Sequence, residues 1–521
     1  MTRTTHLAPS LEAACRRWAG RPALTHRGRT LSYGELWRQV EALAAAYADV
    51  GVQPGDRLIC QLPDRPEHVV AIAAAWARGA IHVGADHDLT AAELTRLALD
   101  TGARATVAQS CTSAPQAPGQ GEGCGPSVHV VFAGTGEAPV FRLDEVLAAP
   151  PTCPAPPGPP HDADDTALLF LTSGTTGRPK GVQETLPALW AKLAYFADAI
   201  APGPDDVHLM YLPIAHAFGL KLSLMALLSG GRLVLLDRFS PEEALRLVTE
   251  ERVSVLPGTP SHFTLLVQAL DPARHRVDSL RWAVGAAAAL TPPLLEQVYG
   301  KLGVELFFVY GCSEGFLTST TDRGEIFAGS VGRHVFCGPE GTPPDGRVAV
   351  VDPATGAALA VDETGEIVFG ARIPVRYWGQ PAVATDGWYH TGDLGRMDGE
   401  GRLFVTGRLK ELINRGGLKV APSEVEATLV RHPAVVDGAV VGVPDPVLGE
   451  AVCACVVVAD GVAPGLAELR SFLGTSLARH KLPDELCVVE AIPRTKISKV
   501  DRSALAELVA EVGPTERLRP R

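Results

Sequence analysis

Short apolar segments alternate with helical patterns through the middle of this chain, and that alternation restricts the fold more than any other feature. Strand-like runs occupy residues 167–171, 207–212, 233–236, 253–256, 280–284 and 304–309. Helical stretches, such as 241–250 and 292–302, separate most of them. This order predicts an α/β fold in which helices cover parallel sheets. Ligands of such folds gather in the loops that follow the strand ends.

The two flanks of this region have patterns of their own. Before it, residues 31–78 read as another α/β unit, with Ser32 as a helix N-cap and Glu35 three residues later. After it, short strands and glycine-rich turns at 347–404 predict a small β-barrel or antiparallel lobe. Beyond Lys410 we expect helices at 422–431 and 466–479 and strands at 435–443, 451–458 and 486–490. These last segments predict a small α+β domain.

Composition excludes several classes of protein. The 521-residue chain is 46% hydrophobic and 20% charged, as soluble globular proteins are, and its length predicts more than one domain. A net charge of −12 argues against a general nucleic-acid or acidic-membrane binder, so an anionic ligand would need a local site. The ten cysteines form no CxxC pair, and Cys453 and Cys455 share one face of an expected strand, which favours buried reduced thiols. There is no signal-peptide core and no apolar run of membrane-spanning length, so we expect a cytoplasmic protein.

A loop rich in phosphate-binding groups follows the strand at 167–171. It reads TSGTTGRPKGV over residues 172–182, with hydroxyl side chains, glycines and two cations close together. Glycine lets backbone N–H groups approach an anion, and the hydroxyl groups and Lys180 add donors and charge. The spacing excludes a Walker A loop, because Lys180 is followed by glycine instead of serine or threonine. The alternative is an ordinary polar loop, which the preceding strand and the density of donors disfavour.

This loop resembles the signature loop of the adenylate-forming superfamily, which includes acyl- and aryl-CoA ligases, firefly luciferase and the adenylation domains of peptide synthetases. Further segments resemble that family in the same order: YLPIAHAFG at 211–219, YGCSE at 310–314, GWYHTGDL at 387–394, and GRLKELI at 407–413. The resemblance covers most of the chain and is weaker at 83–87, VGADH, where a proline-and-asparagine turn is common. It implies a large adenylation domain at 1–409, with two helix-covered sheets and the β lobe, and a mobile lid domain at 410–521 hinged at Lys410.

The resemblance also implies which residues bind ATP. Tyr310 would stack near adenine, and Asp393 and Arg408 would bind the ribose hydroxyls, since a carboxylate suits a vicinal diol. Glu314 would hold Mg²⁺, although a loop carboxylate by itself also fits a solvated position. The full set implied for ATP is Thr172, Ser173, Gly174, Thr175, Thr176, Gly177, Lys180, Gly285, Ala286, Tyr310, Gly311, Ser313, Asp393 and Arg408.

A second set is implied for the carboxylic acid. It comprises His216, Phe218, Gly219, Gly258, Gly285, Ala286, Gly311, Cys312 and Phe316. By itself His216 fits a structural histidine better, but its place in the motif puts it between the acid and ATP. The small residues at 285–289 leave space for a ring or another bulky acid, and no aspartate at 215–220 offers a counter-charge to an α-amino group. We therefore expect an aryl or acyl acid rather than an α-amino acid.

The end of the chain resembles the loop that carries the catalytic lysine of the family. The run PRTKISKVDR at 493–502 places Lys499 where that lysine bridges the carboxylate and the α-phosphate. Ile497 and Ser498 depart from the usual hydroxyl residue and glycine. Lys496 is a rival cation, and a solvated surface lysine is the remaining alternative for Lys499. The catalytic set that the resemblance implies is Lys499, His216 and Glu314.

Together these matches imply ATP-dependent activation of an acid. The carboxylate attacks the α-phosphate, giving an acyl-adenylate and pyrophosphate, and a thiol then takes the acyl group. Gly416 and Gly417 would border a tunnel for a pantetheine arm, so ATP, Mg²⁺ and coenzyme A are the expected cofactors. The alternatives are the arm of a separate acyl carrier protein, another nucleophile, or a nucleotide-binding homologue with altered catalysis. No nucleic acid and no membrane span are expected, and both a monomer and a homodimer suit the fold.

Overall fold

Two sheets with parallel centres build the large domain in the computed structural model, which describes residues 7–110, 127–132, 143–148, 166–172, 180–286, 290–334, 348–370, 375–380, 388–458, 463–495 and 499–518. The larger sheet runs in the order β15-β14-β13-β12-β11-β9-β10-β1-β2, with parallel pairing from β13 to β1. Its strands are β1 (Pro22–His26), β2 (Arg29–Ser32), β9 (Val207–Met210), β10 (Arg232–Leu235), β11 (Val255–Gly258), β12 (Trp282–Gly285), β13 (Glu305–Gly311), β14 (Phe316–Thr320) and β15 (Arg333–His334). This confirms the α/β prediction.

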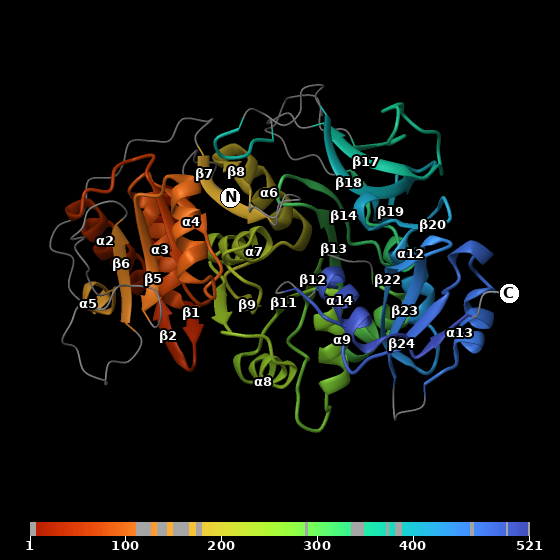
Figure 1. Cartoon of the computed structure of the whole chain (residues 1–521). Helices are drawn as coiled ribbons and strands as arrows, with labels where there is room; N and C mark the ends of the chain where they lie inside the picture. Colours follow the sequence, from red (N-terminus) through yellow and green to blue (C-terminus); the bar gives the residue numbers. More distant parts are fainter. Residues whose placement is uncertain are drawn as a thin grey trace.

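The second sheet lies on the N-terminal side of the molecule (Figure 1). Its order is β6-β5-β3-β4-β7-β8, and the pairs among β5, β3, β4 and β7 are parallel. Its strands are β3 (Arg57–Gln61), β4 (Ile81–Gly84), β5 (Ala105–Ser110), β6 (Ser127–Phe132), β7 (Thr166–Thr172) and β8 (Lys180–Thr185). Antiparallel β8 folds back on β7 directly after the predicted phosphate loop.

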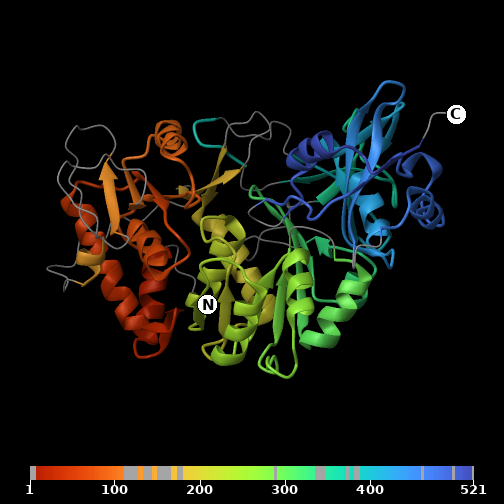
Figure 2. The ribbon, with the colours of Figure 1, turned by 60° about the horizontal axis from the view of Figure 1, so that its bottom comes forward.

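Helices of the large domain cover these sheets, and Figure 2 shows most of them as a layer below the strands. They include α1 (Leu7–Arg17), α2 (Tyr33–Asp49), α3 (Pro66–Ala77), α4 (Ala91–Thr101), α5 (Leu143–Ala148), α6 (Leu186–Ile200), α7 (Ala217–Leu228), α8 (Pro241–Glu251), α9 (Pro260–Ala269), α10 (Pro292–Gln297) and α11 (Arg323–Phe327). The predicted Ser32–Glu35 capping box is present at the start of α2. One apolar cluster runs through both sheets and their helices, so the two sheets share a core.

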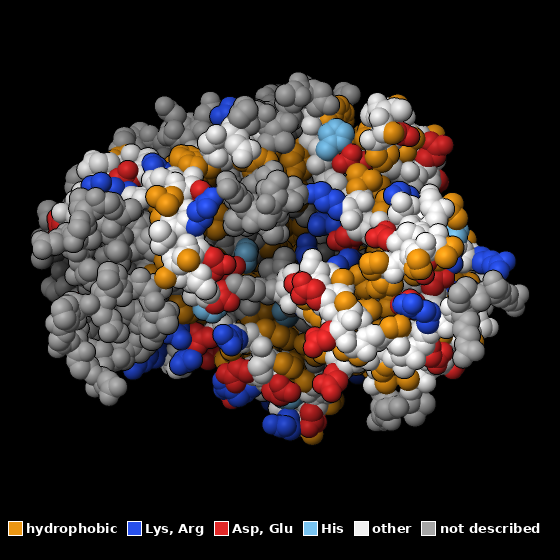
Figure 3. Space-filling model, in the orientation of Figure 1, with side chains coloured by type: hydrophobic (Ala, Val, Ile, Leu, Met, Phe, Trp, Pro, Cys, Tyr) orange, Lys and Arg blue, Asp and Glu red, His pale blue; other side chains and the backbone are white. Residues whose placement is uncertain are grey.

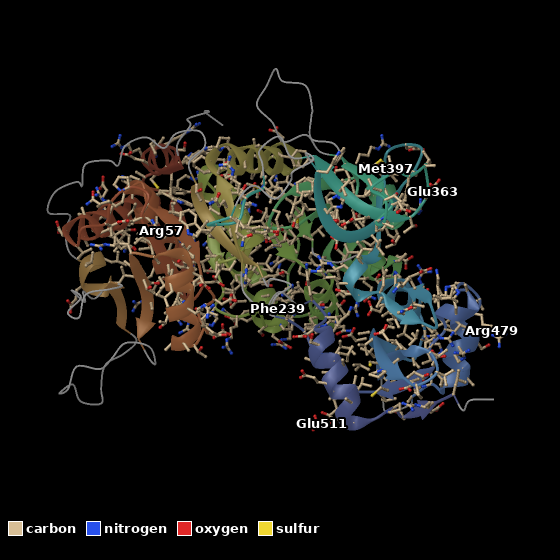
Figure 4. The ribbon with its side chains drawn as sticks, turned by 45° about the horizontal axis from the view of Figure 1, so that its top comes forward. Arg57, Phe239, Glu363, Met397, Arg479 and Glu511 are labelled. Carbon is tan, nitrogen blue, oxygen red and sulfur yellow. The ribbon has the colours of Figure 1, made fainter. Side chains whose placement is uncertain are left out.

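A third sheet and a terminal domain complete the chain. The third sheet is antiparallel and consists of β16 (Val348–Val351), β17 (Gly365–Gly370), β18 (Trp388–Met397) and β19 (Leu403–Arg408). The terminal domain holds β20 (Ile413–Arg415), β21 (Leu418–Val420), α12 (Pro422–Leu429), β22 (Val435–Asp445), β23 (Gly449–Val458), α13 (Leu466–Leu473), β24 (Glu485–Val488), α14 (Arg502–Val512) and β25 (Glu516–Arg517). Figure 4 shows this domain, with Arg479 and Glu511 labelled, beside the third sheet, where Glu363 and Met397 are labelled.

The terminal domain has cores on both faces of its sheet. Val440 of β22 belongs to one cluster, and its neighbour Val441 belongs to the other, as the alternation of a strand requires. Cys453 and Cys455 lie together in the second cluster, so the prediction that they share a face is confirmed. The six cysteines of the described residues are free thiols: Cys15, Cys60, Cys312, Cys453, Cys455 and Cys487. Among the helices of the described ranges, none is long and apolar enough to cross a bilayer.

Several predicted boundaries were wrong by two residues or more. The helix expected at 466–479 ends as α13 at Leu473, because Gly474 and the polar residues behind it form helix poorly. The strand expected at 253–256 begins later, at Val255, and continues to Gly258. For the region 347–404 the sequence left a small β-barrel and an antiparallel lobe as alternatives. The described residues form the antiparallel lobe, since β16 and β19 do not pair with each other and are the two edges of the third sheet.

Candidate active site

Asp393 of β18 is held by two side chains from different strands. The β18–β19 register places Asp393 opposite Arg408. Arg408 Nε lies 2.6 Å from Asp393 Oδ1, and the Tyr310 hydroxyl group donates to Asp393 Oδ2 at 2.8 Å. Burial and the Asp393 charge raise the pKa of Tyr310, so its hydroxyl group stays a donor. The structure therefore brings together three residues that the sequence predicted for ATP, from β13, β18 and β19.

Lys499 approaches this group from the terminal domain. It lies in a tight turn, in which the Thr495 amide donates to the Lys499 carbonyl oxygen at 2.7 Å. Burial lowers the pKa of Lys499, and the charge of Arg408 lowers it further, while Asp393 opposes both effects. The Lys499 ammonium group is therefore close enough to the Asp393–Arg408 pair for their charges to interact. Figure 3 shows Lys and Arg side chains gathered near the centre of the visible face, where Figure 1 labels β13 and β14.

Glu314 has a carboxylate that is only partly occupied by protein donors. The Tyr377 hydroxyl group donates to Glu314 Oε1 at 2.8 Å and lies 3.3 Å from the Tyr389 hydroxyl group. Burial raises the pKa of Tyr377 to about 12, so it remains a donor at neutral pH. The described residues contain no group of three side chains able to hold a metal. A lone carboxylate still fits Mg²⁺, which commonly binds one or two carboxylates together with substrate phosphates and water.

His216 stands where the two sheets of the large domain meet. It is the N-cap residue of α7, in the loop that follows β9. Its Nε2 lies 3.0 Å from Oδ1 of Asp86, a residue that follows β4 of the other sheet. The imidazole is about one third exposed, at 30% of its side-chain surface, so it borders solvent rather than the core.

The predicted acid-pocket glycines end three neighbouring strands. Gly258, Gly285 and Gly311 are the last residues of β11, β12 and β13, and the pairing of these strands places the three ends along one edge. A β-carbon at Gly258 would lie 2.9 Å from the Phe263 ring, and one at Gly285 would lie 3.1 Å from Phe308. Packing alone therefore accounts for glycine at these two positions, and their role in an acid pocket stays a prediction.

Several predicted site residues lie outside the described residues. These are Ser173, Gly174, Thr175, Thr176 and Gly177 of the phosphate loop, together with the run 287–289 and the residues 496–498 beside Lys499. Thr172 and Lys180 are described as the paired ends of β7 and β8, without their side chains. The prediction that the loop follows a strand directly is confirmed.

The predicted tunnel and hinge residues lie in the connection between the third sheet and the terminal domain and in the first hairpin of that domain. Gly416 and Gly417 form the turn between β20 and β21, with φ of 58° and 88°. Positive φ at both turn positions is what a two-residue hairpin requires, so the turn by itself explains this glycine pair. Lys410 lies in a 3₁₀ turn, Leu409–Glu411, between β19 of the third sheet and β20 of the terminal domain. Tunnel and hinge functions stay predictions.

Sequence reasoning missed three residues beside the site. Tyr377 contacts Glu314, Asp86 contacts His216, and the charge of Glu411 acts on Lys499. The weak match at 83–87 was the only sequence signal for Asp86. Tyr377 lies outside the quoted motifs, and Glu411 lies within GRLKELI but was given no role, because both contacts depend on the packing of distant segments.

The Asp393–Arg408 pair and Lys499 of the terminal domain lie in an α/β fold, which is consistent with a nucleotide-binding enzyme. The chain belongs to the AMP-binding enzyme family, whose model matches residues 11–375, and the model of the AMP-binding enzyme C-terminal domain matches residues 424–499. This confirms the predicted adenylate-forming superfamily and its class of acid–thiol ligases.

Named relatives match nearly the whole chain. The 2-hydroxy-7-methoxy-5-methyl-1-naphthoate–CoA ligase of Streptomyces carzinostaticus is 33% identical over 93% of this chain and 90% of its own. The salicyl-AMP ligase / salicyl-S-ArCP synthetase of Mycobacterium tuberculosis is 32% identical over 97% and 91%. The crystal structure of ATP-bound MatB from Rhodopseudomonas palustris superposes with a TM-score of 0.82, at 26% identity, over 98% of this chain and 100% of its own.

The Asp393→Asn variant tests the ribose assignment. We expect KM for ATP to rise by about 10-fold to 100-fold, because a hydrogen bond to a charged group is worth about 1.5–3 kcal/mol. The measurement is ATP-dependent pyrophosphate exchange. Asp362→Asn is the matched control, since Asp362 pairs with Arg396 of the same β18 strand at an exposed position. Equal KM values for the Asp393 variant and the control would contradict the assignment.

Proposed function

We propose that this enzyme activates an aryl or acyl carboxylic acid with ATP and then transfers the acyl group to the thiol of coenzyme A. The observation that supports it best is Lys499, a residue of the terminal domain whose charge interacts with both members of the Asp393–Arg408 pair. A nucleotide held by that pair would have its phosphates within reach of a cation from a different domain. Such an arrangement suits a reaction in which two anions must meet.

The first step forms a mixed anhydride. A carboxylate oxygen attacks the α-phosphorus of ATP, and the bond from that phosphorus to the oxygen bridging to the β-phosphate breaks, so pyrophosphate leaves. Lys499 would offset the charge that the acid and the α-phosphate bring together. Mg²⁺ would neutralise phosphate charge when bound, and Glu314 is the residue that would hold it. Tyr310, Asp393 and Arg408 would fix the nucleoside.

The second step transfers the acyl group to sulfur. The thiol sulfur attacks the acyl carbon, the bond to the phosphate oxygen of AMP breaks, and the thiol proton is released. Lys499 is not needed for this step, because the charge on the α-phosphate no longer has to approach a carboxylate. The domain that carries Lys499 is joined at Lys410, where a rotation would withdraw the lysine and bring the Gly416–Gly417 turn toward the adenylate.

Coenzyme A has one specific rival as the acceptor, the pantetheine arm of a carrier protein. The match with this chain covers 91% of a relative that is named for salicyl-S-ArCP synthesis. A carrier protein presents a pantetheine thiol, as coenzyme A does. Coenzyme A is the first candidate because another relative is named as a CoA ligase with an aryl acid. That same relative supports an aryl acid as the substrate class.

Pyrophosphate exchange with a panel of acids tests this function. We expect exchange with aryl or acyl acids, little with free α-amino acids, and CoA-dependent AMP release with the best acid. A clear preference for α-amino acids would overturn the acid class. Exchange without any consumption of CoA, restored by a pantetheinylated carrier protein, would replace coenzyme A by the carrier. No exchange with any acid would overturn the proposal of adenylation.

A further inference from the structure

The segment that carries His216 is fastened to the ends of two strands of the other sheet. Asp64 follows β3, and its Oδ1 accepts a hydrogen bond from the Ile214 amide at 2.8 Å. Asp86 follows β4, and its Oδ1 lies 3.0 Å from His216 Nε2. The parallel neighbours β3 and β4 therefore each provide one carboxylate to a loop that belongs to the larger sheet.

Close backbone contact between the sheets makes this arrangement specific. Gly84 is the last residue of β4, and a β-carbon there would lie 2.3 Å from the carbonyl oxygen of Ala215. No side chain can be accommodated at that distance, so glycine lets the end of β4 approach the loop directly. Asp86, two residues later, is then close enough to His216 for an ion pair.

The charged groups around this contact come from several elements. Asp64 is only 12% exposed, and His68 Nδ1 of α3 lies 3.8 Å from its Oδ1. Burial raises the pKa of Asp64 to about 7, the Ile214 hydrogen bond and the His216 charge lower it, and the charges of Asp86 and Asp237 raise it again. Asp237, which follows β10, is paired in turn with Arg65, Arg27 and His26. Within this network His216 pairs with Asp86.

We propose that Asp86 is a positioning residue that fixes the orientation and the proton of the His216 imidazole at the acid site. A carboxylate only accepts hydrogen bonds, so the Nε2 atom facing Asp86 must carry the hydrogen. The neutral ring is thereby held as one tautomer, with its Nδ1 unprotonated, and a protonated ring is stabilised by the same partner. This inference rests on the proposed function, in which His216 lies between the acid and ATP.

The sequence makes this pairing a property of this chain. The segment 83–87 departs from the proline-and-asparagine turn of the resembling proteins and provides Asp86 instead. An asparagine side chain can both donate and accept, so it would leave the tautomer of a facing imidazole open. Aspartate removes that choice.

A double-mutant cycle tests the proposal. We expect Asp86→Asn to lower kcat for pyrophosphate exchange by about 10-fold to 100-fold, as misplacement of a group by about 1 Å does, and to leave KM for ATP unchanged, because the Asp393–Arg408 pair is untouched. In a His216→Ala background the same substitution should have no further effect on kcat. Asp100→Asn is the matched control: its carboxylate is paired with Arg96 on exposed α4 of the same lobe, and kcat should not change.

The outcomes separate this inference from the proposed function. An equal loss of kcat from Asp86→Asn with and without His216 would overturn it, because Asp86 would then act independently of the imidazole. An unchanged kcat in the Asp86→Asn variant of the His216-containing enzyme would overturn it as well. Failure of the proposed function would be seen earlier, as no acid-dependent exchange by the unmodified enzyme. Thermal unfolding of each variant shows whether a loss of kcat reflects a loss of fold.

Discussion

Lys499→Met should lower the rate of adenylate formation by about 10²-fold to 10³-fold, the cost of removing one charge-stabilising group from an active site. Lys499 is mostly buried and lies beside Arg408 and Asp393, so no water can replace its ammonium group easily. Methionine keeps the length of the side chain and removes only the charge and the donors. Pyrophosphate exchange with the preferred acid measures this step.

The second half-reaction provides the contrast. With preformed acyl-adenylate, the Lys499→Met variant should transfer the acyl group to the thiol at nearly the rate of the unmodified enzyme. Lys301→Met is the matched control, since Lys301 is exposed and its ammonium group donates to the Val267 carbonyl oxygen in a different part of the large domain. Equal losses of rate in both half-reactions would contradict a role of Lys499 confined to adenylation. An unchanged rate of pyrophosphate exchange would mean that Lys499 is a structural lysine without a catalytic role.

Glu184→Gln should lower the free energy of unfolding by about 3–5 kcal/mol at pH 7, because it leaves two buried cations without their shared carboxylate. Glu184 is 2% exposed, and its carboxylate oxygens lie 2.6 Å from Lys192 Nζ and 3.0 Å from Lys221 Nζ. Burial alone would raise the pKa of Glu184, but the two lysine charges outweigh burial and lower it. Denaturant unfolding measures the loss.

The pH dependence of that loss follows from Lys221. Burial lowers the pKa of Lys221 to about 8, although Glu184 opposes the shift. A base whose pKa is lower in the folded chain than in the unfolded chain reduces stability while it is protonated. This cost disappears as the pH rises from the pKa of the folded chain toward the pKa of the unfolded chain. Glu184 raises the pKa of Lys221, so in Glu184→Gln this lysine loses its proton at a lower pH than in the unmodified chain. The deficit of Glu184→Gln should therefore shrink as the pH rises toward about 8 and stay constant above it.

Lys221→Met is the matched test of the same cluster. It removes one cation from α7 and leaves a neutral pair of Glu184 with Lys192. Replacing part of a buried charged cluster by an apolar side chain of similar length is often neutral or stabilising. We expect a change within about 1 kcal/mol in either direction. If Lys221→Met lowered the free energy of unfolding as much as Glu184→Gln does, the cost would come from the buried carboxylate rather than from unpaired cations.

Local features were predictable from the sequence. The capping box of Ser32 and Glu35 depends on residues three apart, so the pattern alone determines it. Asp393 and Arg408 were identified from the short motifs around them, and the β18–β19 hairpin then places them opposite each other. Lys499 was assigned from the register of the terminal motif, and the structure brings it to the same group.

Long-range partners were not predictable in the same way. The carboxylate facing His216 comes from the end of a strand in the other sheet, and no local pattern encodes which strand end will lie there. Glu184 of β8 meets Lys221 of α7 only because α6 packs against both of these elements. Helix α13 ends at Leu473 for a local reason instead, since Gly474 is its C-cap residue.

The sequence by itself determined the family and the order of its motifs, and it predicted which residues bind the nucleotide, because catalysis requires fixed residue types at short spacings. The tertiary structure alone decided which charges meet: Asp86 with His216, Glu184 with two lysines, and Lys499 with a pair from the other domain. The physical reason is that a buried charge needs a partner within a few ångströms, and only the packing of the sheets determines which distant residue occupies that position.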